Sequence, residues 1–416
     1  MNKTKVLYLH HAKDFSSNPV YLSDDFLLAN KSLFGAQEMD SWAGYRILTR
    51  DFLVYRLQIS VNLSAIQLSL PNGNSLSPIA IRIPTGFRAK MNREYIKSLI
   101  KYLDTSFALF SDSLLSKSIT EIIRKFDISL VWSDTQFYSP FLPSEFRVLI
   151  RSVNFEPFHV LREDPSPLRL LRMIGKVWSE KRTLREKQVI AISPRDAFLY
   201  SKLAHRRIKH LPLRQLGFLL EQSPNWSQFS NPTYPSFVYF AGSNFDVKHN
   251  RDNLINLMTH VAPALAELNP EIILLVFGHR FPKDLKVPFN VRHMYFRDDF
   301  HNLASLALAS LVPNKGGAGM QSKIFEPLCR GIPLIAHSGA IAGYPFDSAT
   351  HFWKGDSVEE IIDSLNTIIN SPTEGALKAK NSKELAQSLF GIQFLRKEIM
   401  DTVKDYSDTI FKNSVI

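Results

Sequence analysis

The sequence contains one cysteine, Cys329, among its 416 residues. A single cysteine excludes an intramolecular disulfide framework and a zinc site built from a cysteine cluster, and it fits a reducing compartment. The longest apolar stretches, 272–277 and 303–313, are too short or too interrupted for the roughly 20 residues that cross a bilayer. The apolar run at 6–9 is shorter than a signal-peptide core. We therefore expect a cytoplasmic protein, with peripheral contact to the inner face of a membrane left open.

Several common catalytic and binding motifs are also missing. The chain has no Walker-type phosphate loop, no zinc-protease helix motif and no serine-hydrolase elbow. Its basic residues do not alternate with aromatic ones as in a nucleic-acid-binding module. Kinases and common hydrolases thus lose their usual sequence support, and we expect no nucleic-acid partner.

The composition favours a packed protein with anionic partners. Hydrophobic residues make up 45% of the chain and charged residues 21%, which argues against disorder. The formal net charge of +11 favours phosphorylated ligands, nucleic acid or an acidic membrane surface. Charge alone does not choose among these three.

Short apolar runs alternate with longer helical patterns, which is typical of βαβ units and parallel sheets. The expected fold class is therefore α/β. Strands are predicted in the first half at 5–10, 45–48, 79–83, 128–132, 147–153 and 189–192, and in the second at 237–241, 272–277, 291–296, 310–313 and 333–336.

The segment from Pro212 to Pro235 contains four prolines, which exclude a regular helix or a central strand across it. We place the domain boundary there. The predicted units are an N-terminal Rossmann-like domain at 1–215, a linker at 216–236, a second Rossmann-like domain at 237–395 and a helix at 396–416 that packs back across the domains.

A glycine-rich turn joins a predicted strand to a predicted helix in the second half. Its residues Gly316, Gly317 and Gly319 allow a ligand to approach the backbone closely, and free N–H groups at a helix start favour phosphate. Lys323 and Glu326 lie three residues apart on the helix, so a cation for phosphate shares a face with a carboxylate for sugar hydroxyls. A tight loop with a surface ion pair is the alternative interpretation.

The second half resembles the family 4 glycosyltransferases of the GT-B fold, particularly bacterial sugar transferases of polysaccharide assembly. The opening strand, helix and second strand of that family's donor domain are similar to Phe240-Ala-Gly-Ser243, His249-Asn250 and Val276-Phe-Gly-His279. The stretch 317–333 resembles the family's nucleotide-sugar loop and helix. The resemblance extends over residues 237–345.

The resemblance implies two Rossmann-like domains that face a central cleft. It implies a hexosyltransferase-type enzyme that moves a sugar from a nucleoside diphosphate donor to a hydroxyl of a glycan, a lipid-linked acceptor or a cell-surface polysaccharide precursor, with retention at the anomeric carbon. Lys323 and the helix start would stabilise the departing diphosphate without a metal, and Glu326 would accept hydrogen bonds from the ribose hydroxyls. No cofactor is implied, because the nucleotide-sugar is a substrate.

The expected donor-binding residues lie in the matching segments and at strand ends: Gly242, Ser243, Asn250, Gly278, His279, Gly317, Ala318, Gly319, Met320, Gln321, Lys323 and Glu326. Ala318 departs from the family pattern, because the first of two glutamates eight positions apart stands there in the family. Sugar recognition would then depend on backbone N–H groups of 317–320. Ser243 stands where a basic residue is common. Asn250 has a second interpretation as the cap of the helix beside it.

The first half resembles the end of the family's acceptor domain more loosely, through Arg151-Ser-Val-Asn-Phe-Glu156, Glu180 and Ile190-Ala-Ile-Ser-Pro-Arg-Asp196. Arg151 and Asn154 follow a predicted strand end and are expected to bind the acceptor. Glu156 and His159 are expected to orient it and to complete, with Lys323 and Glu326, the catalytic group.

Between Arg162 and Lys187, eight Lys or Arg residues stand against four Asp or Glu, and they alternate with apolar residues such as Leu171 and Trp178. A basic amphipathic helix of this kind can lie on anionic lipid, which would suit a lipid-linked acceptor. A solvated helix packed on the sheet is the alternative.

Three other functions stay open at this point. A nucleotide-sugar epimerase of the same fold needs paired acid and base groups in the cleft, for which Glu156 and His159 are candidates. A non-catalytic nucleotide-sugar-binding scaffold is suggested by Ala318. A nucleic-acid-binding protein would lose affinity steeply with salt, since its contacts would be mainly to phosphates.

Overall fold

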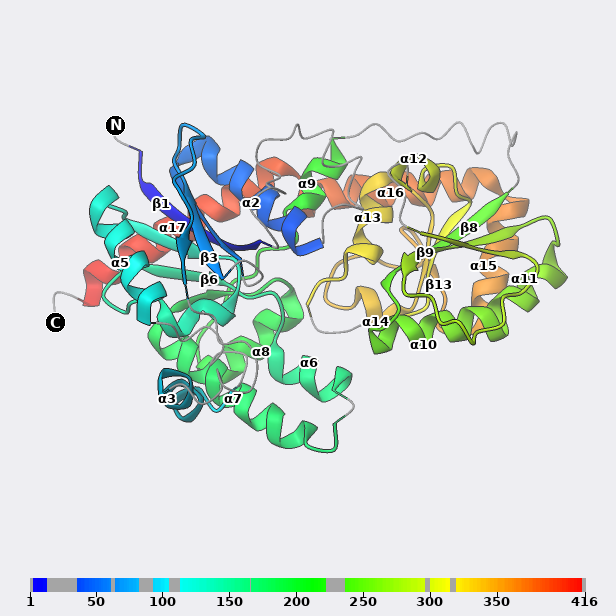
Figure 1. Ribbon diagram of the computed structural model, residues 1–416. Helices are drawn as coiled ribbons and strands as arrows, with labels where there is room; N and C mark the ends of the chain where they lie inside the picture. The colour runs from blue at the N-terminus through cyan, green and yellow to red at the C-terminus, as the bar shows by residue number, and fades with distance from the viewer. Residues whose placement is uncertain are drawn as a thin grey trace.

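The computed structural model describes residues 3–12, 36–60, 64–81, 93–104, 113–164, 166–221, 236–295, 300–314 and 319–413. The chain forms two Rossmann-like α/β domains side by side (Figure 1). The fold class predicted from the alternation of apolar runs and helical patterns is thereby confirmed. In the described ranges, no helix has the length and apolar character needed to cross a membrane.

The N-terminal sheet has the strand order β4-β3-β2-β1-β5-β6-β7. Its strands are β1 (Lys5–Ala12), β2 (Leu53–Ser60), β3 (Ala65–Ser69), β4 (Ile79–Ala80), β5 (Leu130–Ser133), β6 (Val148–Arg151) and β7 (Gln188–Ile190). The five strands from β2 to β7 in this order run parallel, whereas β3 and β4 pair antiparallel at one edge. The parallel strands therefore direct the loops that follow β1, β5, β6 and β7 to one edge of the sheet.

Helices cover both faces of this sheet, because successive residues of the central strand point to opposite sides. Val6 and Tyr8 pack in one apolar core, and Leu7 and Leu9 pack in another. The helices of this half are α2 (Ala36–Asp51), α3 (Arg93–Tyr102), α5 (Ser113–Phe126), α6 (Glu156–Glu163), α7 (Arg169–Glu186), α8 (Pro194–Ala204), α9 (Gln215–Leu220) and the 3₁₀ turn η4 (Gln136–Phe141).

The C-terminal sheet is parallel throughout, with the order β10-β9-β8-β11-β12-β13. Its strands are β8 (Phe237–Asn244), β9 (Ile273–His279), β10 (Val291–Met294), β11 (Ala309–Val312), β12 (Leu334–Ala336) and β13 (Trp353–Lys354). Its helices are α10 (Lys248–Asn256), η6 (Leu257–Val261), α11 (Ala262–Leu268), α12 (Phe300–Ala304), α13 (Ser322–Arg330), α14 (Ser338–Ile341), α15 (Val358–Asn370) and α16 (Pro372–Phe390).

The last helix, α17 (Ile392–Asn413), returns to the N-terminal domain and lies along α2 (Figure 1). Arg396 on α17 donates to Asp51 with a distance of 2.7 Å from its Nε, and the Tyr406 hydroxyl accepts the N–H of Val148 at 3.1 Å. One apolar core contains residues of both domains, such as Trp42 and Phe325. The two domains are thus joined by a shared core as well as by the chain.

Some sequence predictions about elements are wrong. Residues 45–48 belong to α2 and not to a strand, because this helix is buried on nearly all sides and its apolar run hides the helical period. β2, β3 and β13 were not predicted. The predicted linker 216–236 contains most of α9, all of whose residues are buried, and its part at 222–235 lies outside the described residues.

Candidate functional site

Gly319, the last glycine of the turn between β11 and α13, lies at the junction of the two domains. Residues 315–318, which include the predicted donor residues Gly317 and Ala318, lie outside the described residues. Gly319 follows them with a positive φ of 74°, and its N–H donates to Asp196 Oδ2 of the N-terminal domain at 3.0 Å. A Cβ on Gly319 would lie 2.2 Å from Asn154 Oδ1. Only glycine fits this position, both for its φ and for the contact across the domains.

Asp196 belongs to the first turn of α8, which begins after Ser193. The Ser193 hydroxyl accepts the N–H of Asp196 at 3.1 Å, so the local sequence Ser-Pro-Arg-Asp caps the helix and fixes the carboxylate. Burial raises the pKa of Asp196 to about 6, against the hydrogen bonds from Ser193 and Gly319. The predicted end of the acceptor domain therefore supplies the surface that receives the glycine-rich turn.

Lys323 lies in the first turn of α13 and points to β8 and α10. Its Nζ donates to Asn250 Oδ1 at 2.7 Å and lies 5.7 Å from the centre of the Phe240 ring. The side chain is half-buried along its length, and burial lowers the pKa of Lys323 to about 7. Asn250 in turn donates to the carbonyl of Asn244 at 3.0 Å. The interpretation of Asn250 as a helix cap is wrong, since α10 begins at Lys248 after Val247 and Asn250 lies inside it.

Glu326, one turn further along α13, contacts a different element. It is 7% exposed, and its Oε1 accepts a hydrogen bond from Gln215 Nε2 of α9 at 3.0 Å. Two other predicted donor-binding residues lie just before this helix. The N–H of Leu213 donates to the sulfur of Met320 at 3.4 Å. Gln321 Oε1 accepts a hydrogen bond from the side chain of Asn314 at 3.0 Å. The segment 319–326 is therefore in contact with both domains.

The predicted residues at the ends of β8 and β9 lie together at the carboxyl edge of the sheet. Gly242 lies at a bulge in β8, and a Cβ there would be 2.2 Å from the ring of Phe245. Glycine at position 242 therefore leaves room for the ring of Phe245 to pack against the strand. Gly278 and His279 end β9, and His279 is exposed. Ser243 belongs to the same bulge, and its side chain lies outside what the structure describes.

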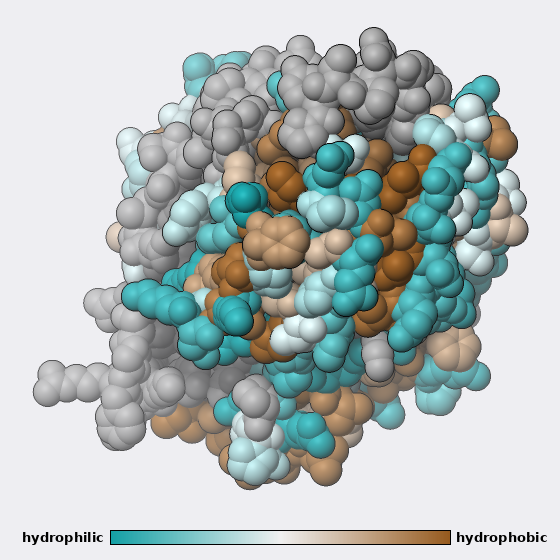
Figure 2. Space-filling model, turned by 90° about the vertical axis from the view of Figure 1, so that its right-hand side faces the viewer, coloured by the Kyte–Doolittle hydropathy of each residue, from teal (hydrophilic) through white to brown (hydrophobic). Residues whose placement is uncertain are grey.

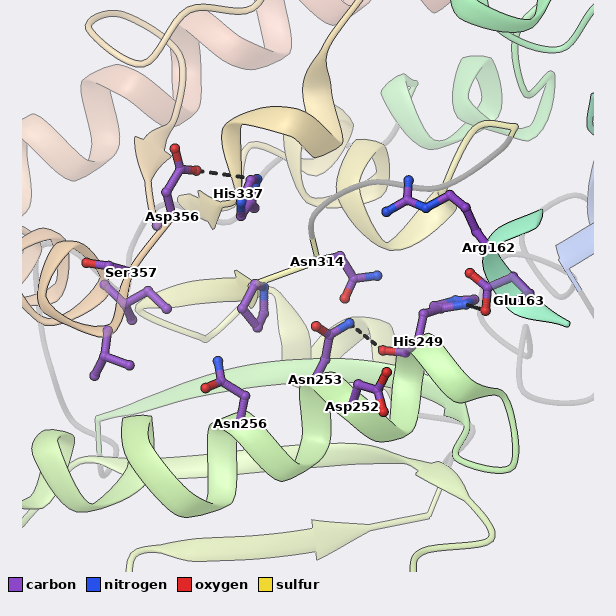
Figure 3. A pocket seen from close by; sticks show the side chains of 14 residues that line it. Arg162, Glu163, His249, Asp252, Asn253, Asn256, Asn314, His337, Asp356 and Ser357 are labelled. Carbon is purple, nitrogen blue, oxygen red and sulfur yellow. Dashed lines mark hydrogen bonds and ion pairs between the residues drawn. The ribbon is translucent and has the colours of Figure 1, made fainter. Parts of the chain in front are cut away.

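A cavity of about 520 Å³ opens at this edge of the C-terminal sheet, between α10, the ends of β11, β12 and β13, and α6 of the other domain (Figure 3). It is lined by Arg162, Glu163, His249, Asp252, Asn253, Asn256, Pro313, Asn314, His337, Gly355, Asp356, Ser357, Val358 and Ile361. Cavities of roughly 300–1,000 Å³ with a few polar groups hold small-molecule ligands. The position agrees with the rule that ligands bind at the carboxyl ends of strands in α/β sheets.

A hydrogen bond between a histidine and a carboxylate closes one side of this cavity. His249 Nδ1 of α10 lies 3.0 Å from Glu163 Oε2 of α6, so the pair joins the two domains (Figure 3). Burial lowers the pKa of His249, and the nearby Lys323 lowers it further against the effect of Glu163. On the far side, His337 Nδ1 lies 3.4 Å from Asp356 Oδ1. Arg162 is exposed beside the first pair and supplies a cation at the mouth.

A second cavity, of about 200 Å³, lies at the junction of the two domains. It is lined by Asp40, Asp134, Arg151, Val153, Asn154, Ile192, Leu213, Met320 and Ser322. Asn154 and Arg151, both predicted to bind the acceptor, line it. Arg151 is 1% exposed, and its Nη1 donates to Asp40 at 2.6 Å while its other nitrogens donate to the carbonyls of Leu211 and Pro212. Its donors are thus directed at protein acceptors.

One wall of this cavity belongs to a buried ionic cluster, which we define as Asp40, Asp134, Arg151 and Arg214. Arg214 Nη2 lies 2.9 Å from Asp40 Oδ2 and 2.8 Å from Asp134 Oδ2. Burial alone would raise the pKa of Asp134, but Arg214, Arg151 and the hydrogen bond from Tyr8 together hold that pKa below its usual value. Neither aspartate was predicted, because each is a single acidic residue far from the others in the sequence.

None of the four predicted catalytic residues, Lys323, Glu326, Glu156 and His159, lines either of these cavities. Glu156 begins α6, is 6% exposed, and lies 3.7 Å from Lys176 Nζ. His159 is half-buried on the same helix, close enough to His249 to influence its pKa. The structure therefore directs Glu156 into the N-terminal domain and His159 toward the domain junction.

Sequence reasoning missed most of the residues that line the larger cavity. Asn314 and His337 directly follow predicted strands, so the strand-end rule would have found them. Arg162 and Glu163 come from the other domain, and no spacing in the sequence links them to this cavity. In the described part of the chain, no three His, Cys, Asp or Glu residues form a group that could hold a metal ion.

No protein-family model matches the chain, and no curated protein matches it in sequence. Solved structures match over nearly its whole length. Sucrose-phosphate synthase from Thermosynechococcus elongatus is 15% identical with a TM-score of 0.63, over 98% of this chain and 100% of that one. Anabaena HepE in complex with UDP is 14% identical with a TM-score of 0.58, over 97% and 100%. α,α-Trehalose 6-phosphate synthase from Burkholderia multivorans is 9% identical with a TM-score of 0.61, over 99% and 100%.

At this level of identity the likeness is one of fold. The two parallel-sheet Rossmann-like domains are arranged as in GT-B glycosyltransferases, and the GT-B fold predicted from the resemblance is confirmed.

Proposed function

We propose that the chain is a glycosyltransferase that moves a sugar from a nucleoside diphosphate donor to an acceptor hydroxyl. The observation that carries the proposal is the cavity of about 520 Å³ at the carboxyl ends of the C-terminal strands, which α6 of the other domain closes. Its lining residue His249 precedes Asn250, the hydrogen-bond partner of Lys323. The fold neighbour HepE has been solved with UDP and with UDP-glucose. We therefore propose a uridine diphosphate sugar as the donor.

Three groups are suited to a diphosphate. Arg162 lines the cavity and supplies positive charge, and Lys323 supplies a second cation from the first turn of α13. The N-terminus of that helix also favours an anion. Charged groups of this kind stabilise the negative charge that develops on a departing diphosphate. Glu326 would accept hydrogen bonds from the ribose hydroxyls after it exchanges its bond with Gln215. This arrangement supports transfer without a metal.

The smaller cavity is proposed to receive the acceptor hydroxyl, because Asn154 and Ser322 line it on opposite sides of the domain junction. In the proposed step, the bond between the anomeric carbon and the diphosphate oxygen breaks and a bond to the acceptor oxygen forms. The acceptor's proton passes to the departing phosphate oxygen. Attack on the face that the phosphate leaves gives retention, and no protein nucleophile is required.

The positions of these residues also bear on the two alternative functions, an epimerase and a non-catalytic scaffold. An epimerase needs an acid and a base that reach the sugar ring, and Glu156 instead lies beside Lys176. A scaffold that binds nucleotide-sugars without transferring the sugar is the other alternative. It fits the presence of Ala318 where the family has the first of its two glutamates. This alternative predicts binding of the donor without sugar transfer. We therefore propose a glycan or polysaccharide precursor as acceptor and keep the scaffold as the second candidate.

The test is calorimetric titration with UDP-, GDP- and ADP-sugars and the free diphosphates, without metal and then with magnesium. We expect saturable binding of the uridine series without metal, and at least a tenfold loss in Lys323→Ala. Lys286→Ala, an exposed lysine of the same domain, is the matched control and should bind normally. Failure of folded protein to bind any nucleotide-sugar would overturn the proposal. Binding with no sugar transfer to any acceptor would favour the scaffold.

A further inference from the structure

Two neighbouring helices of the N-terminal domain expose large apolar side chains to solvent. Each of these side chains is between 43% and 70% exposed, and we call them together the α3–α7 face: Ile96, Ile100, Leu103, Leu168, Leu170, Leu171, Ile174 and Trp178. Single exposed apolar residues are normal on a protein surface, whereas a contiguous group marks an interaction site. We therefore expect this group of side chains to contact a binding partner.

The two helices are packed so that their apolar stripes adjoin. A Cβ on Gly175 would lie 2.2 Å from the carbonyl oxygen of Leu103, so the missing side chain lets the end of α3 contact α7. Trp178 Nε1 donates to the carbonyl of Lys101 at 3.3 Å. The opposite side of α7, including Glu180, is buried in the domain. The apolar side chains are therefore left on the outer surface by the packing itself.

The charges around this face are mainly positive. Exposed basic residues stand on both helices, namely Lys97, Lys101, Arg169, Arg172 and Arg185, and of these Arg172 pairs with Asp164 at 2.8 Å. Of the acidic side chains described on the two helices, Glu180 is buried and Glu186 pairs with Arg182 at 2.9 Å. A face that combines apolar side chains with a basic border complements the surface of a bilayer with anionic lipids.

The α3–α7 face also lies next to the cleft. α6 precedes α7 directly and ends at Arg162 and Glu163, which line the larger cavity. In Figure 2, hydrophobic side chains lie along the lower edge of the molecule, at the height of α6 and α7 in Figure 1. A bilayer under α3 and α7 would therefore run close to the mouth of the cleft.

We propose that the α3–α7 face docks the protein on a bilayer surface that contains anionic lipid. The apolar side chains enter the boundary between headgroups and acyl chains, and the basic residues contact the lipid phosphates. This proposal goes beyond the proposed glycosyl transfer and does not require it. If both hold, an acceptor anchored in the membrane reaches the cleft without leaving the bilayer.

The test is flotation of the whole protein with vesicles of phosphatidylcholine alone or of phosphatidylcholine with an equal amount of phosphatidylglycerol. We expect binding to the mixed vesicles that falls at least tenfold with pure phosphatidylcholine or in the triple variant Leu171→Ser/Ile174→Ser/Trp178→Ser. The matched control is Val287→Ser/Phe289→Ser/Tyr295→Ser, which removes exposed apolar side chains from the C-terminal domain. This control should float as the unchanged protein does.

A second variant separates charge from apolar contact. Lys97→Gln/Lys101→Gln/Arg169→Gln is expected to lose about tenfold or more on mixed vesicles and little on neutral ones, because these side chains act on the anionic headgroups. Equal flotation of the unchanged protein and the apolar triple variant would overturn the proposal, as would failure of the folded protein to float at all.

Two further measurements distinguish membrane binding from donor binding and from self-association. The apolar triple variant should bind nucleotide-sugars as the unchanged protein does, so loss of membrane binding and loss of donor binding are distinguishable. Analytical ultracentrifugation shows whether a second copy covers the face instead. A dimer that the triple variant abolishes, together with absent vesicle binding, would assign the face to self-association and reject the membrane.

Discussion

The two domains turn different kinds of charge toward their junction. On the N-terminal side, the buried ionic cluster of Asp40, Asp134, Arg151 and Arg214 is paired within itself at distances of 2.6–2.9 Å. On the C-terminal side, Lys323 donates to an amide oxygen, and in the described part of the chain no carboxylate lies within ion-pair distance of its Nζ. One side holds its charges in a closed set, and the other leaves a cation with a neutral partner.

Under the proposed function, the difference separates charge that stabilises the fold from charge that binds a ligand. Burying an ion without an opposite charge is costly, so a paired set is stable as it stands while an underpaired cation gains when an anion arrives. The lowered pKa of Lys323 expresses the same cost, because burial favours its neutral form. Burial of charge alone therefore does not identify a binding residue. The absence of an ionic partner is the more informative property.

The largest expected effect breaks the closed set. Arg214→Met leaves Asp40 and Asp134 facing each other without their shared cation, and loss of one partner from a buried pair costs about 3–5 kcal/mol. We expect a loss of this size in the free energy of unfolding by urea. Arg207→Met, which removes an exposed arginine nearby, should change it by less than about 0.5 kcal/mol. A small effect of Arg214→Met would show that the cluster is not what stabilises this side.

A somewhat smaller effect is expected where the two domains meet at Gly319. Gly319→Ala adds a Cβ at a positive φ and within 2.2 Å of Asn154 Oδ1. The left-handed backbone alone costs about 1–2 kcal/mol, and the clash adds to it. Urea unfolding measures the sum, and donor titration measures whether the turn is displaced.

Gly73→Ala is the matched control for the backbone term. Gly73 has a φ of 89°, and nothing lies within 4 Å of the position that a Cβ would take there, so only the backbone cost applies. The difference between the two alanine variants then isolates the contact across the domains. Equal losses would mean that Asn154 moves aside freely. In Asn154→Gly/Gly319→Ala, part of the extra loss should be recovered.

The third prediction concerns the underpaired cation. In the proposed function, the diphosphate binds the protonated form of Lys323, whose pKa is about 7 in the free protein, and binding of the anion would raise that pKa. Affinity for a nucleotide-sugar should thus be full below pH 7 and decline above it, by up to tenfold for each pH unit. Calorimetry from pH 6 to 9 measures this, and a diphosphate sugar carries constant charge in that range. Lys323→Gln should bind weakly at every pH, and an unchanged slope in that variant would exclude Lys323 as the cause.

The sequence led to the fold more reliably than to the site. The apolar runs and strand ends located both Rossmann-like halves, because buried parallel strands of this kind are continuous in sequence. The glycine-rich turn and Lys323 could be proposed from the sequence for the same reason, because their pattern is local. The ionic cluster was not, since Asp40 and Arg214 meet only after folding. The placement of α6 over the cavity is likewise a property of how the domains pack.

The smallest effect is expected from Glu163, the carboxylate that acts on Lys323 from across the junction. Its pair with His249 is partly exposed, and such pairs contribute about 0.2–1 kcal/mol, so Glu163→Gln should change stability and donor affinity only slightly. Glu163 raises the pKa of Lys323, and its removal should lower that pKa further. The pH at which nucleotide-sugar binding declines would then shift to a lower value. A matched change at an exposed, distant site, Glu384→Gln, should leave it unchanged. A shift in the opposite direction would mean that Lys323 does not set the pH dependence, and the contrast between the two sides of the cleft would then need another cation.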